Sequence, residues 1–181
     1  YPASGDGLFK NSDEAVLEED KLRMYLSLTM SLMYIARLTR PDILLPVAYL
    51  ASRSHIANPT DFKKLLKVLR YLKGTKTLSI TIKCTDLQLY AHCDASANVH
   101  ADGKGHTGYF ISLGSTHSYI HSKSGKQRLT GTSSTDCELF ALVECVKTAI
   151  WIRNFLFELQ LDKIRTIQIY QDNRSLSLIH I

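Results

Sequence analysis

Residues 87–96 constrain the fold of this chain more than any other stretch, because they alternate apolar and other residues and end in an acid followed by small residues. In a strand, Leu87, Leu89 and Ala91 would lie on one face, with the polar and aromatic side chains between them on the other. The turn-forming residues that begin at Asp94 would stop the strand. We therefore expect Asp94 to lie at a sheet edge, where a strand becomes a loop.

Two further acids are expected at the ends of secondary-structure elements. Glu138 lies in the first turn of a helix predicted at residues 135–159, and Asp172 follows a strand predicted at residues 164–171. Carboxylates in such places can hold Mg²⁺, which binds through a few carboxylates, water and phosphate oxygens. Two such ions could stabilise the attacking and leaving oxygens of a phosphodiester, so we expect the three carboxyl groups to converge within about 4 to 8 Å.

Each acid also has a local explanation that involves no metal. Asp94 could act only as a turn former. Thr135 and Glu138 match the capping-box pattern, in which the glutamate reaches back to the backbone amide of the cap residue. Asp172 and Asn173 could cap the terminal helix predicted after them. A Glu138 side chain folded onto the Thr135 amide, far from Asp94, would favour the capping box.

Six short blocks that include these acids resemble, in the same order, the ribonuclease H domain of copia-type LTR retrotransposon polyproteins. The blocks are Asp94-Ala-Ser, Gly103-Lys-Gly-His-Thr-Gly-Tyr109, Lys126-Gln-Arg-Leu, Ser133-Ser-Thr-Asp-Cys-Glu-Leu139, Ile150-Trp-Ile-Arg153 and Tyr170-Gln-Asp-Asn173. Residues 31–43 and 69–75 are similar to the segment that joins the reverse transcriptase of those polyproteins to its ribonuclease H. The resemblance covers nearly everything from about residue 22 to the end.

The resemblance implies an α/β (α+β) fold, a ribonuclease H-like mixed sheet with flanking helices, preceded by an α-helical connection segment. It also implies hydrolysis of the RNA strand of RNA–DNA hybrids, with Mg²⁺ or Mn²⁺ as the cofactor. Asp94 would contact both ions, and Glu138 and Asp172 one ion each. Recognition would rest on the 2′-hydroxyl and on groove width. The hybrid backbone would be contacted by Ser133, Ser134, Thr135, Asn173, Lys123, Lys126 and Arg128.

The chain departs from the family pattern at a fourth metal carboxylate. The family carries this acid on a later segment, whereas no acid follows Asp172 here. We therefore expect hybrid cleavage by the 181 residues alone to be weak or undetectable with Mg²⁺. The alternative is a truncated or repurposed remnant that binds nucleic acid without cleaving it. The catalytic carboxylates of reverse transcriptase are absent, which excludes polymerase activity for this chain alone.

The order of patterns predicts a helical region followed by a sheet. Residues 1–18 are rich in Gly, Ser, Asp and Glu and have no apolar period, which predicts a flexible acidic linker. The connection segment would span residues 19–76 and the ribonuclease H-like domain, C-terminally incomplete, residues 77–181. Helices are expected at 19–38, 42–52, 59–73 and 173–179. Further strands are expected at 78–83, 108–113 and 117–121, and residues 78–83 could form a hairpin with the strand that leads to Asp94.

Charge favours a polyanionic partner, such as an RNA–DNA hybrid or another nucleic acid. The net charge is +5, but residues 1–20 hold six acids and one lysine, which leaves +10 on the remainder. Lys63, Lys67 and Arg70, with Lys64 beside them, would line the outer face of the helix at 59–73. This stripe is either a phosphate-binding surface, whose affinity would fall with salt, or the solvated side of an amphipathic helix.

The four cysteines show no Cys-x-x-Cys spacing and no secretory signal precedes them, so we expect buried thiols in a reduced intracellular setting, a cytoplasmic particle or the nucleus, rather than secretion. The most apolar stretch, residues 24–50, is interrupted by charged residues and proline, which argues against a membrane partner. The other expected partner is the remainder of a retroelement polyprotein.

Overall fold

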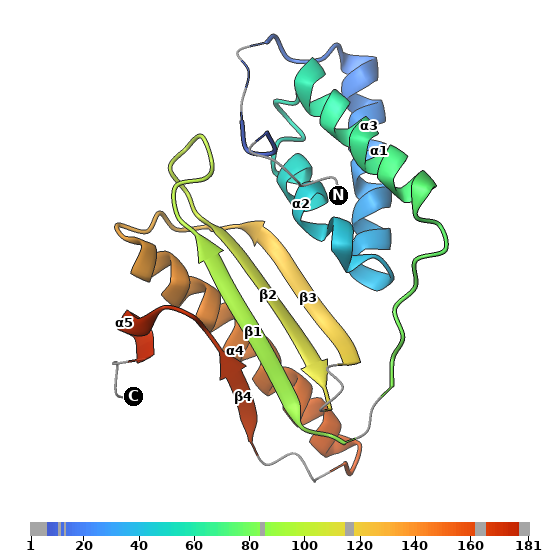
Figure 1. The fold of residues 1–181 in the computed structure, drawn as a ribbon. Helices are drawn as coiled ribbons and strands as arrows, with labels where there is room; N and C mark the ends of the chain where they lie inside the picture. The colour runs from blue at the N-terminus through green and yellow to red at the C-terminus, as the bar shows by residue number, and fades with distance from the viewer. Residues whose placement is uncertain are drawn as a thin grey trace. The chain divides into compact units, whose positions relative to one another are not determined.

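A computed structural model of the chain describes residues 7–10, 12, 14–83, 86–114, 118–161 and 166–177. They form two compact units, residues 1–80 (unit 1) and 81–181 (unit 2). Unit 1 is helical, and unit 2 contains a sheet (Figure 1). None of the described helices is long and apolar enough to cross a membrane.

Unit 1 confirms the three helices predicted before the sheet. They are α1 (Glu19–Leu38), α2 (Leu44–Ser52), which follows a short 3-10 helix η1 (Pro41–Ile43), and α3 (Pro59–Gly74). Arg40 leaves helical geometry, with φ −132° and ψ 63°, because a proline follows it. Asn58 begins α3 by accepting a hydrogen bond from the Asp61 amide at 2.9 Å.

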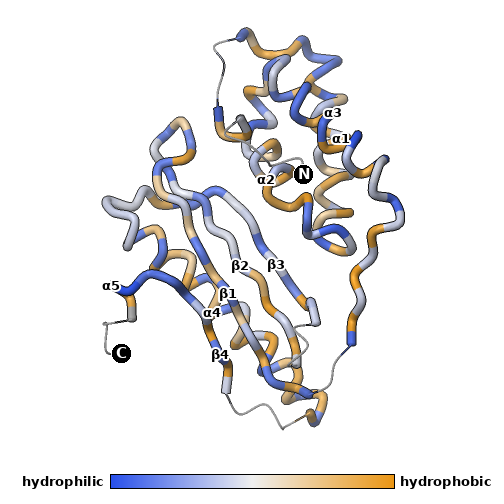
Figure 2. The backbone as a smooth tube through the Cα atoms, viewed as in Figure 1, coloured by the Kyte–Doolittle hydropathy of each residue, from blue (hydrophilic) through white to orange (hydrophobic). Residues whose placement is uncertain are grey.

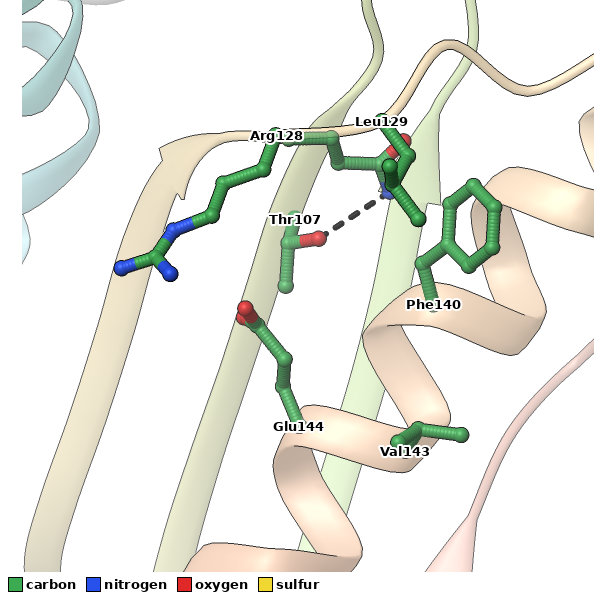
Figure 3. A pocket seen from close by; sticks show the side chains of 7 residues that line it. Thr107, Arg128, Leu129, Phe140, Val143 and Glu144 are labelled. Carbon is green, nitrogen blue, oxygen red and sulfur yellow. Dashed lines mark hydrogen bonds between the residues drawn. The ribbon is translucent and has the colours of Figure 1, made fainter.

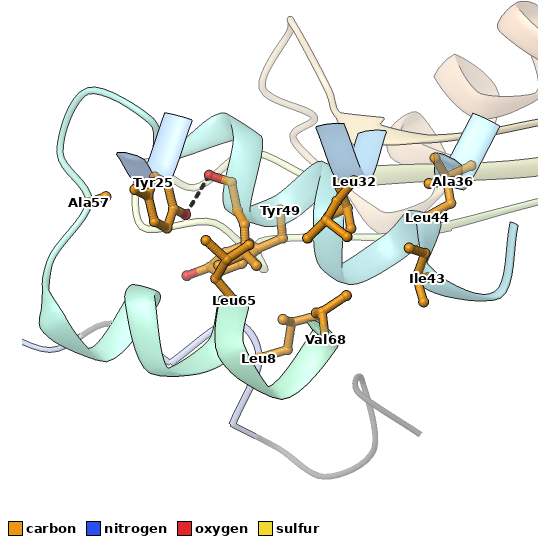
Figure 4. Packing of buried hydrophobic residues seen from close by; sticks show 12 residues of the cluster. Leu8, Tyr25, Leu32, Ala36, Ile43, Leu44, Tyr49, Ala57, Leu65 and Val68 are labelled. Carbon is orange, nitrogen blue, oxygen red and sulfur yellow. Dashed lines mark hydrogen bonds between the residues drawn. The ribbon is translucent and has the colours of Figure 1, made fainter. Parts of the chain in front are cut away.

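The core of unit 1 is formed where the three helices meet. Figure 2 shows α2 as a mostly hydrophobic helix, and its residues Val47, Tyr49 and Leu50 are buried. They pack in one cluster with Leu65 of α3 and Tyr25 of α1 (Figure 4). The Tyr25 hydroxyl is also satisfied, because it donates to the Leu50 carbonyl at 2.8 Å. Apolar spacing therefore identified the inward face of α3. It did not identify that of α1, whose buried residues are Tyr25, Thr29, Leu32 and Ala36, whereas the apolar Leu26 and Met30 are exposed.

The described residues of the N-terminal segment pack against unit 1, so the prediction of a flexible linker is wrong for them. Leu8 is only 8% exposed and belongs to the hydrophobic cluster. The Leu17 amide donates to the Ala57 carbonyl at 2.9 Å, and the Glu14 carboxylate accepts hydrogen bonds from the Thr60 amide and hydroxyl. The few apolar residues of this acidic stretch, Leu8, Phe9, Val16 and Leu17, show no period, so composition alone could not predict this packing.

Lys64 is half-buried because it binds the same N-terminal segment, so its predicted place on the exposed outer stripe of α3 is wrong. Its ammonium group donates to the carbonyls of Leu8 and Lys10 at 2.9 and 2.7 Å. The other three members of the stripe are exposed: Lys63, Lys67 and Arg70.

Unit 2 is built on a four-stranded mixed sheet in the order β3-β2-β1-β4. The strands are β1 (Leu89–Ser96), β2 (His106–Leu113), β3 (Ser118–Lys126) and β4 (Ile167–Tyr170), and the helices are α4 (Ser134–Glu158) and α5 (Arg174–Ser177). β1 pairs antiparallel with β2 and parallel with β4, and β2 pairs antiparallel with β3. This confirms the predicted mixed sheet with flanking helices and is consistent with a ribonuclease H-like α+β fold.

The core of unit 2 lies between the sheet and α4, which runs along one face of the sheet (Figure 1). Alternate residues of β1, including Ala91 and Cys93, pack with Cys145 and Ala149 of α4. The alternation predicted for this strand is confirmed. The three described cysteines, Cys93, Cys137 and Cys145, are free and buried as expected, and Cys84 lies outside the described residues.

Residues 78–83 do not form the predicted strand, and the hairpin with β1 is wrong. They are exposed and irregular despite their alternating sequence. Both edges of β1 are already paired, with β2 and β4, so no edge remains for a further strand. Lys83 instead contacts the start of β3, where its amide donates to the Ser118 hydroxyl at 2.9 Å and its carbonyl accepts from that hydroxyl.

The other unit 2 predictions differ from the structure mainly in their bounds. The strand expected at 117–121 is described from Ser118 and extends to Lys126; His117 lies outside the described residues. The strand expected at 164–171 is Ile167–Tyr170: Thr166 and Gln171 are described but lie outside the strand, and residues 162–165 are not among the described residues. The terminal helix is described as Arg174–Ser177, and residues 178–181 are not among the described residues.

Candidate metal centre

Asp94 and Asp172 are brought together by the parallel pairing of β1 and β4. His92 of β1 is paired with Tyr170 of β4, so each acid lies two residues beyond a paired position. Asp94 is exposed near the end of β1, and Asp172 is exposed in the polar stretch that follows β4. Figure 2 shows this stretch as hydrophilic. The sheet register therefore places both carboxylates at the same end of two neighbouring strands.

Glu138 reaches the same place from α4. The capping box of this helix is formed by Ser133 and Asp136, because the Ser133 side chain accepts from the Asp136 amide and the Asp136 carboxylate accepts from the Ser133 amide, both at 3.1 Å. The capping box proposed for Thr135 and Glu138 is therefore wrong. The helix begins one residue earlier than predicted, which moves Glu138 beyond the first turn onto the buried face of α4.

The three carboxylates converge as predicted. One oxygen from each of Asp94, Glu138 and Asp172 can be chosen so that all three lie within 4.8 Å of one another. Within the described residues, no other group of three or more His, Cys, Asp or Glu side chains is close enough to hold a metal ion. Carboxylate oxygens are the ligands that Mg²⁺ and Mn²⁺ prefer, so the donor set fits the expected cofactor.

The electrostatics of this cluster are unfavourable for a third negative charge. Glu138 is 7% exposed, and burial together with the charge of Asp94 raises the pKa of its carboxyl group. Hydrogen bonds from Gln171 and from the Ala95 amide act in the opposite direction on that pKa but do not cancel the rise. A cation placed between the carboxylates would favour the charged form of Glu138.

Gln171 is a contributor to this site to which sequence reasoning gave no role. Its side-chain nitrogen donates to a Glu138 carboxylate oxygen at 3.4 Å, and its side-chain oxygen accepts from the Asn173 amide at 2.9 Å. One amide thus connects the buried acid of α4 to the loop that carries Asp172. The available signal was its place in a polar run that directly follows a strand.

The residues predicted to contact nucleic acid differ in their exposure and in the partners that they already have. Ser133 caps α4, while Ser134 is exposed and Thr135 half-buried in its first turn. Lys123 is paired with Glu144 at 2.8 Å, and Lys126 is paired with Asp102 at 2.7 Å. Asn173 is half-buried and donates its amide to Gln171. Nucleic-acid binding by these residues, and by the exposed stripe of α3 in unit 1, stays a prediction.

Arg128 is exposed beside an apolar pocket of about 380 Å³ in unit 2. Its guanidinium group extends away from Phe140 and Val143, as Figure 3 shows. The Gln127 side chain lies in the same wall and donates to the Thr107 hydroxyl at 3.0 Å. None of the three clustered acids lines this pocket. The remaining lining residues are Leu129 and Glu144.

The chain is similar to several known proteins. It is 32% identical over 130 residues to secreted RxLR effector protein 161 of Plasmopara viticola. The aligned region covers 71% of this chain and 90% of that protein. It is 34% identical over 151 residues to the retrovirus-related Pol polyprotein from transposon RE1 of Arabidopsis thaliana, covering 82% of this chain and 10% of the polyprotein. The corresponding polyprotein from transposon TNT 1-94 of Nicotiana tabacum is 30% identical over 152 residues, with 83% and 11% covered.

The chain therefore spans about a tenth of the length of these transposon polyproteins. No protein-family model matches the chain, and no solved structure matches it.

Proposed function

Because this chain belongs to one family with secreted RxLR effector protein 161 and with a segment of the retrotransposon Pol polyproteins, we propose that unit 2 is a metal-dependent nuclease domain that hydrolyses the RNA strand of RNA–DNA hybrids. The observation that carries this proposal is the convergence of Asp94, Glu138 and Asp172 within 4.8 Å. A local role for each acid leaves this convergence without an explanation.

In this proposal the three carboxylates hold Mg²⁺ or Mn²⁺ at the end of β1. When bound, the cation would lower the pKa of a water and stabilise negative charge on the phosphate oxygens. Asp94 and Asp172 are exposed and can face the substrate, whereas Glu138 is buried and would bind the cation from the side of α4. Since the pKa of Glu138 is raised, protons compete with the cation more strongly at this carboxylate than at an ordinary glutamate, and the affinity for the cation should increase with pH.

The substrate backbone would be held by polar and basic groups near the start of α4. Ser134 and Arg128 are exposed, and Lys126 lies at the end of β3 opposite His106, whose partner in β1 is Ser96. Lys126 is therefore at the same end of the sheet as Asp94. A net charge of +5 on the chain adds a sequence-independent attraction for phosphate.

A second candidate function is nucleic-acid binding without cleavage. The relative from Plasmopara viticola is the reason to consider it, because the matched region makes up 90% of a protein that is not a Pol polyprotein by name. A chain of this family can therefore exist apart from a long polyprotein. In such a protein the carboxylate cluster would be retained by ancestry rather than for hydrolysis.

Hybrid cleavage tests the proposal. Labelled RNA–DNA hybrid would be incubated with an excess of the full chain in Mg²⁺ and in Mn²⁺, because single-turnover conditions detect slow hydrolysis. In keeping with the weak cleavage expected from the sequence, we expect slow metal-dependent cleavage that Asp94→Asn reduces by at least about 100-fold, since loss of one ligand misplaces the reacting groups. Glu158→Gln, which neutralises an exposed acid elsewhere on α4, should cleave like the wild type.

Two outcomes would count against cleavage as the function. Cleavage that persists undiminished in Asp94→Asn would show that another site or a contaminating nuclease is responsible. Binding of the hybrid by the wild-type chain with no cleavage in either metal would support the second candidate instead.

A further inference from the structure

Four aromatic rings form a stack across three strands of unit 2. His92 of β1 lies between Phe110 of β2, with ring centroids 5.2 Å apart, and Tyr170 of β4, with centroids 4.7 Å apart. The planes of these pairs differ by only 17° and 12°. Tyr90 of β1 also stacks on Tyr170, at 6.5 Å and 15°. The rings thus stand nearly parallel, side by side across the sheet.

This stack lies on the face of the sheet opposite α4. Successive strand residues point to opposite faces, and the neighbours Leu89, Ala91 and Cys93 of β1 face the helix. In the described part of unit 2 the helices are α4 and the short α5, and the core that α4 forms with the sheet is on the other side. The aromatic face is therefore not part of the hydrophobic core of the unit.

The stack leads directly to the candidate metal centre. His92 and Asp94 are two residues apart within β1, so they share a sheet face, and Tyr170 is the last residue of β4, two residues before Asp172. Two residues of a strand span about 6.6 Å. A nucleic-acid strand whose phosphate lies at the carboxylates would therefore place a neighbouring nucleotide beside these rings.

Tyr170 is the exposed end of the stack. It is 47% exposed, and both rings that stack on it belong to β1, so they cover only one face of its ring. β4 is the last strand on that side of the described sheet (Figure 1). The Tyr170 hydroxyl donates to the Gln168 side-chain oxygen at 3.0 Å, which helps to fix the ring.

We propose that the outer face of the Tyr170 ring stacks with an unpaired nucleobase of the substrate strand, next to the phosphodiester at the metal centre. The proposal rests on the proposed function and narrows its substrate class to RNA–DNA hybrids in which the RNA strand becomes single-stranded beside the cleavage position. An aromatic ring accepts any base, because every base has a flat π face, so this contact requires no particular sequence.

Charge at the same end of the sheet suits a nucleic-acid strand better than an apolar peptide. Lys104 and Lys126 both lie near Asp102, at 3.7 and 2.7 Å, so these three side chains carry a net positive charge. Lys126 of β3 is the register partner of His106 in β2, and Ser122, two positions before Ser124, is the partner of the stacked Phe110. Phosphates can therefore approach this end of the sheet while a base occupies the aromatic face.

The test measures binding of a labelled single-stranded decamer by fluorescence anisotropy. All proteins would carry Asp94→Asn, so that no hydrolysis occurs during the measurement. We expect Tyr170→Leu to weaken binding about 10-fold, because it removes a base-stacking surface, and Tyr170→Phe to bind within about twofold of Tyr170. Tyr34→Leu is the matched control, since Tyr34 is 70% exposed on α1 of unit 1.

A second strand makes the result independent of how well the leucine variant folds. A decamer with the same backbone but no bases should bind to the protein with Tyr170 about 10-fold more weakly than the intact decamer does. The Tyr170→Leu protein should bind the two decamers with equal affinity. Equal affinity of the Tyr170 protein for both strands, or equal affinity of the Leu and Phe variants for the intact strand, would overturn the proposal.

The two proposals fail separately. Tyr170-dependent binding by a chain that cleaves nothing would leave the stacking site in place and remove the nuclease. Asp94-dependent cleavage, with binding that depends neither on Tyr170 nor on the bases, would support the nuclease and remove the stacking site.

Discussion

Asp61→Ala is expected to lower the free energy of unfolding of unit 1 by about 3 to 5 kcal/mol. Asp61 is 1% exposed, and its carboxylate accepts a hydrogen bond from Arg53 at 2.7 Å and one from the Asn58 amide at 3.3 Å. Lys64 lies 3.7 Å from the same carboxylate. The substitution leaves the largely buried Arg53 charge without its partner and removes half of the capping box of α3.

Urea unfolding of the full chain, with hydrogen exchange of the α1 to α3 amides to identify unit 1, would measure this loss. Glu19→Ala is the matched control, because Glu19 forms an exposed ion pair with Arg23 on α1. Such surface pairs contribute about 0.3 to 0.5 kcal/mol. A loss for Asp61→Ala no larger than for the control would contradict a structural role for the buried pair.

Acid is expected to destabilise unit 2 by up to about 3 kcal/mol through His106. His106 is 5% exposed, and its ring nitrogens lie 3.0 Å from His100 and 2.7 Å from the Ser124 hydroxyl. Burial, and then the neighbouring His100, lower the pKa of His106 from 6.5 to about 4. Burial also lowers the pKa of His100, with Lys126 acting in the same direction.

The sign follows from these lowered pKa values. The unfolded chain takes up a proton near pH 6.5, whereas folded His106 does so only near pH 4, so the stabilisation is complete above pH 6.5 and is lost as the pH falls toward 4. Urea unfolding at a series of pH values should therefore show a shallower acid loss for His106→Gln, which cannot titrate. His55→Gln, at an exposed histidine of unit 1, should follow the wild type. Parallel curves for all three proteins would exclude His106 as the cause.

The two acids at strand ends were predictable because a strand has a simple period. Alternation identified both faces of β1 and of β4, and the polar residues after each strand located Asp94 and Asp172. The parallel pairing that brings them together is a long-range contact, which alternation within a single strand does not predict.

Helix starts and isolated apolar contacts were harder to predict. Thr135 and Glu138 satisfy the capping-box spacing as well as Ser133 and Asp136 do, and a shift of two residues in the cap position decides whether Glu138 caps the helix or enters the site. Leu8 packs against unit 1 although nothing periodic surrounds it. Residues 78–83 alternate but form no strand, because alternation does not supply a pairing partner and both edges of the expected partner, β1, are occupied by β2 and β4.

The central claim is that Asp94, Glu138 and Asp172 together bind a divalent cation. A calorimetric titration of the full chain with Mn²⁺ alone, without nucleic acid, tests it most directly. The account predicts saturable binding that strengthens as the pH rises, because the pKa of Glu138 is raised, and that Asp94→Asn weakens by at least about 10-fold while Glu158→Gln leaves it unchanged. Equal Mn²⁺ affinities for the wild type and Asp94→Asn would contradict it.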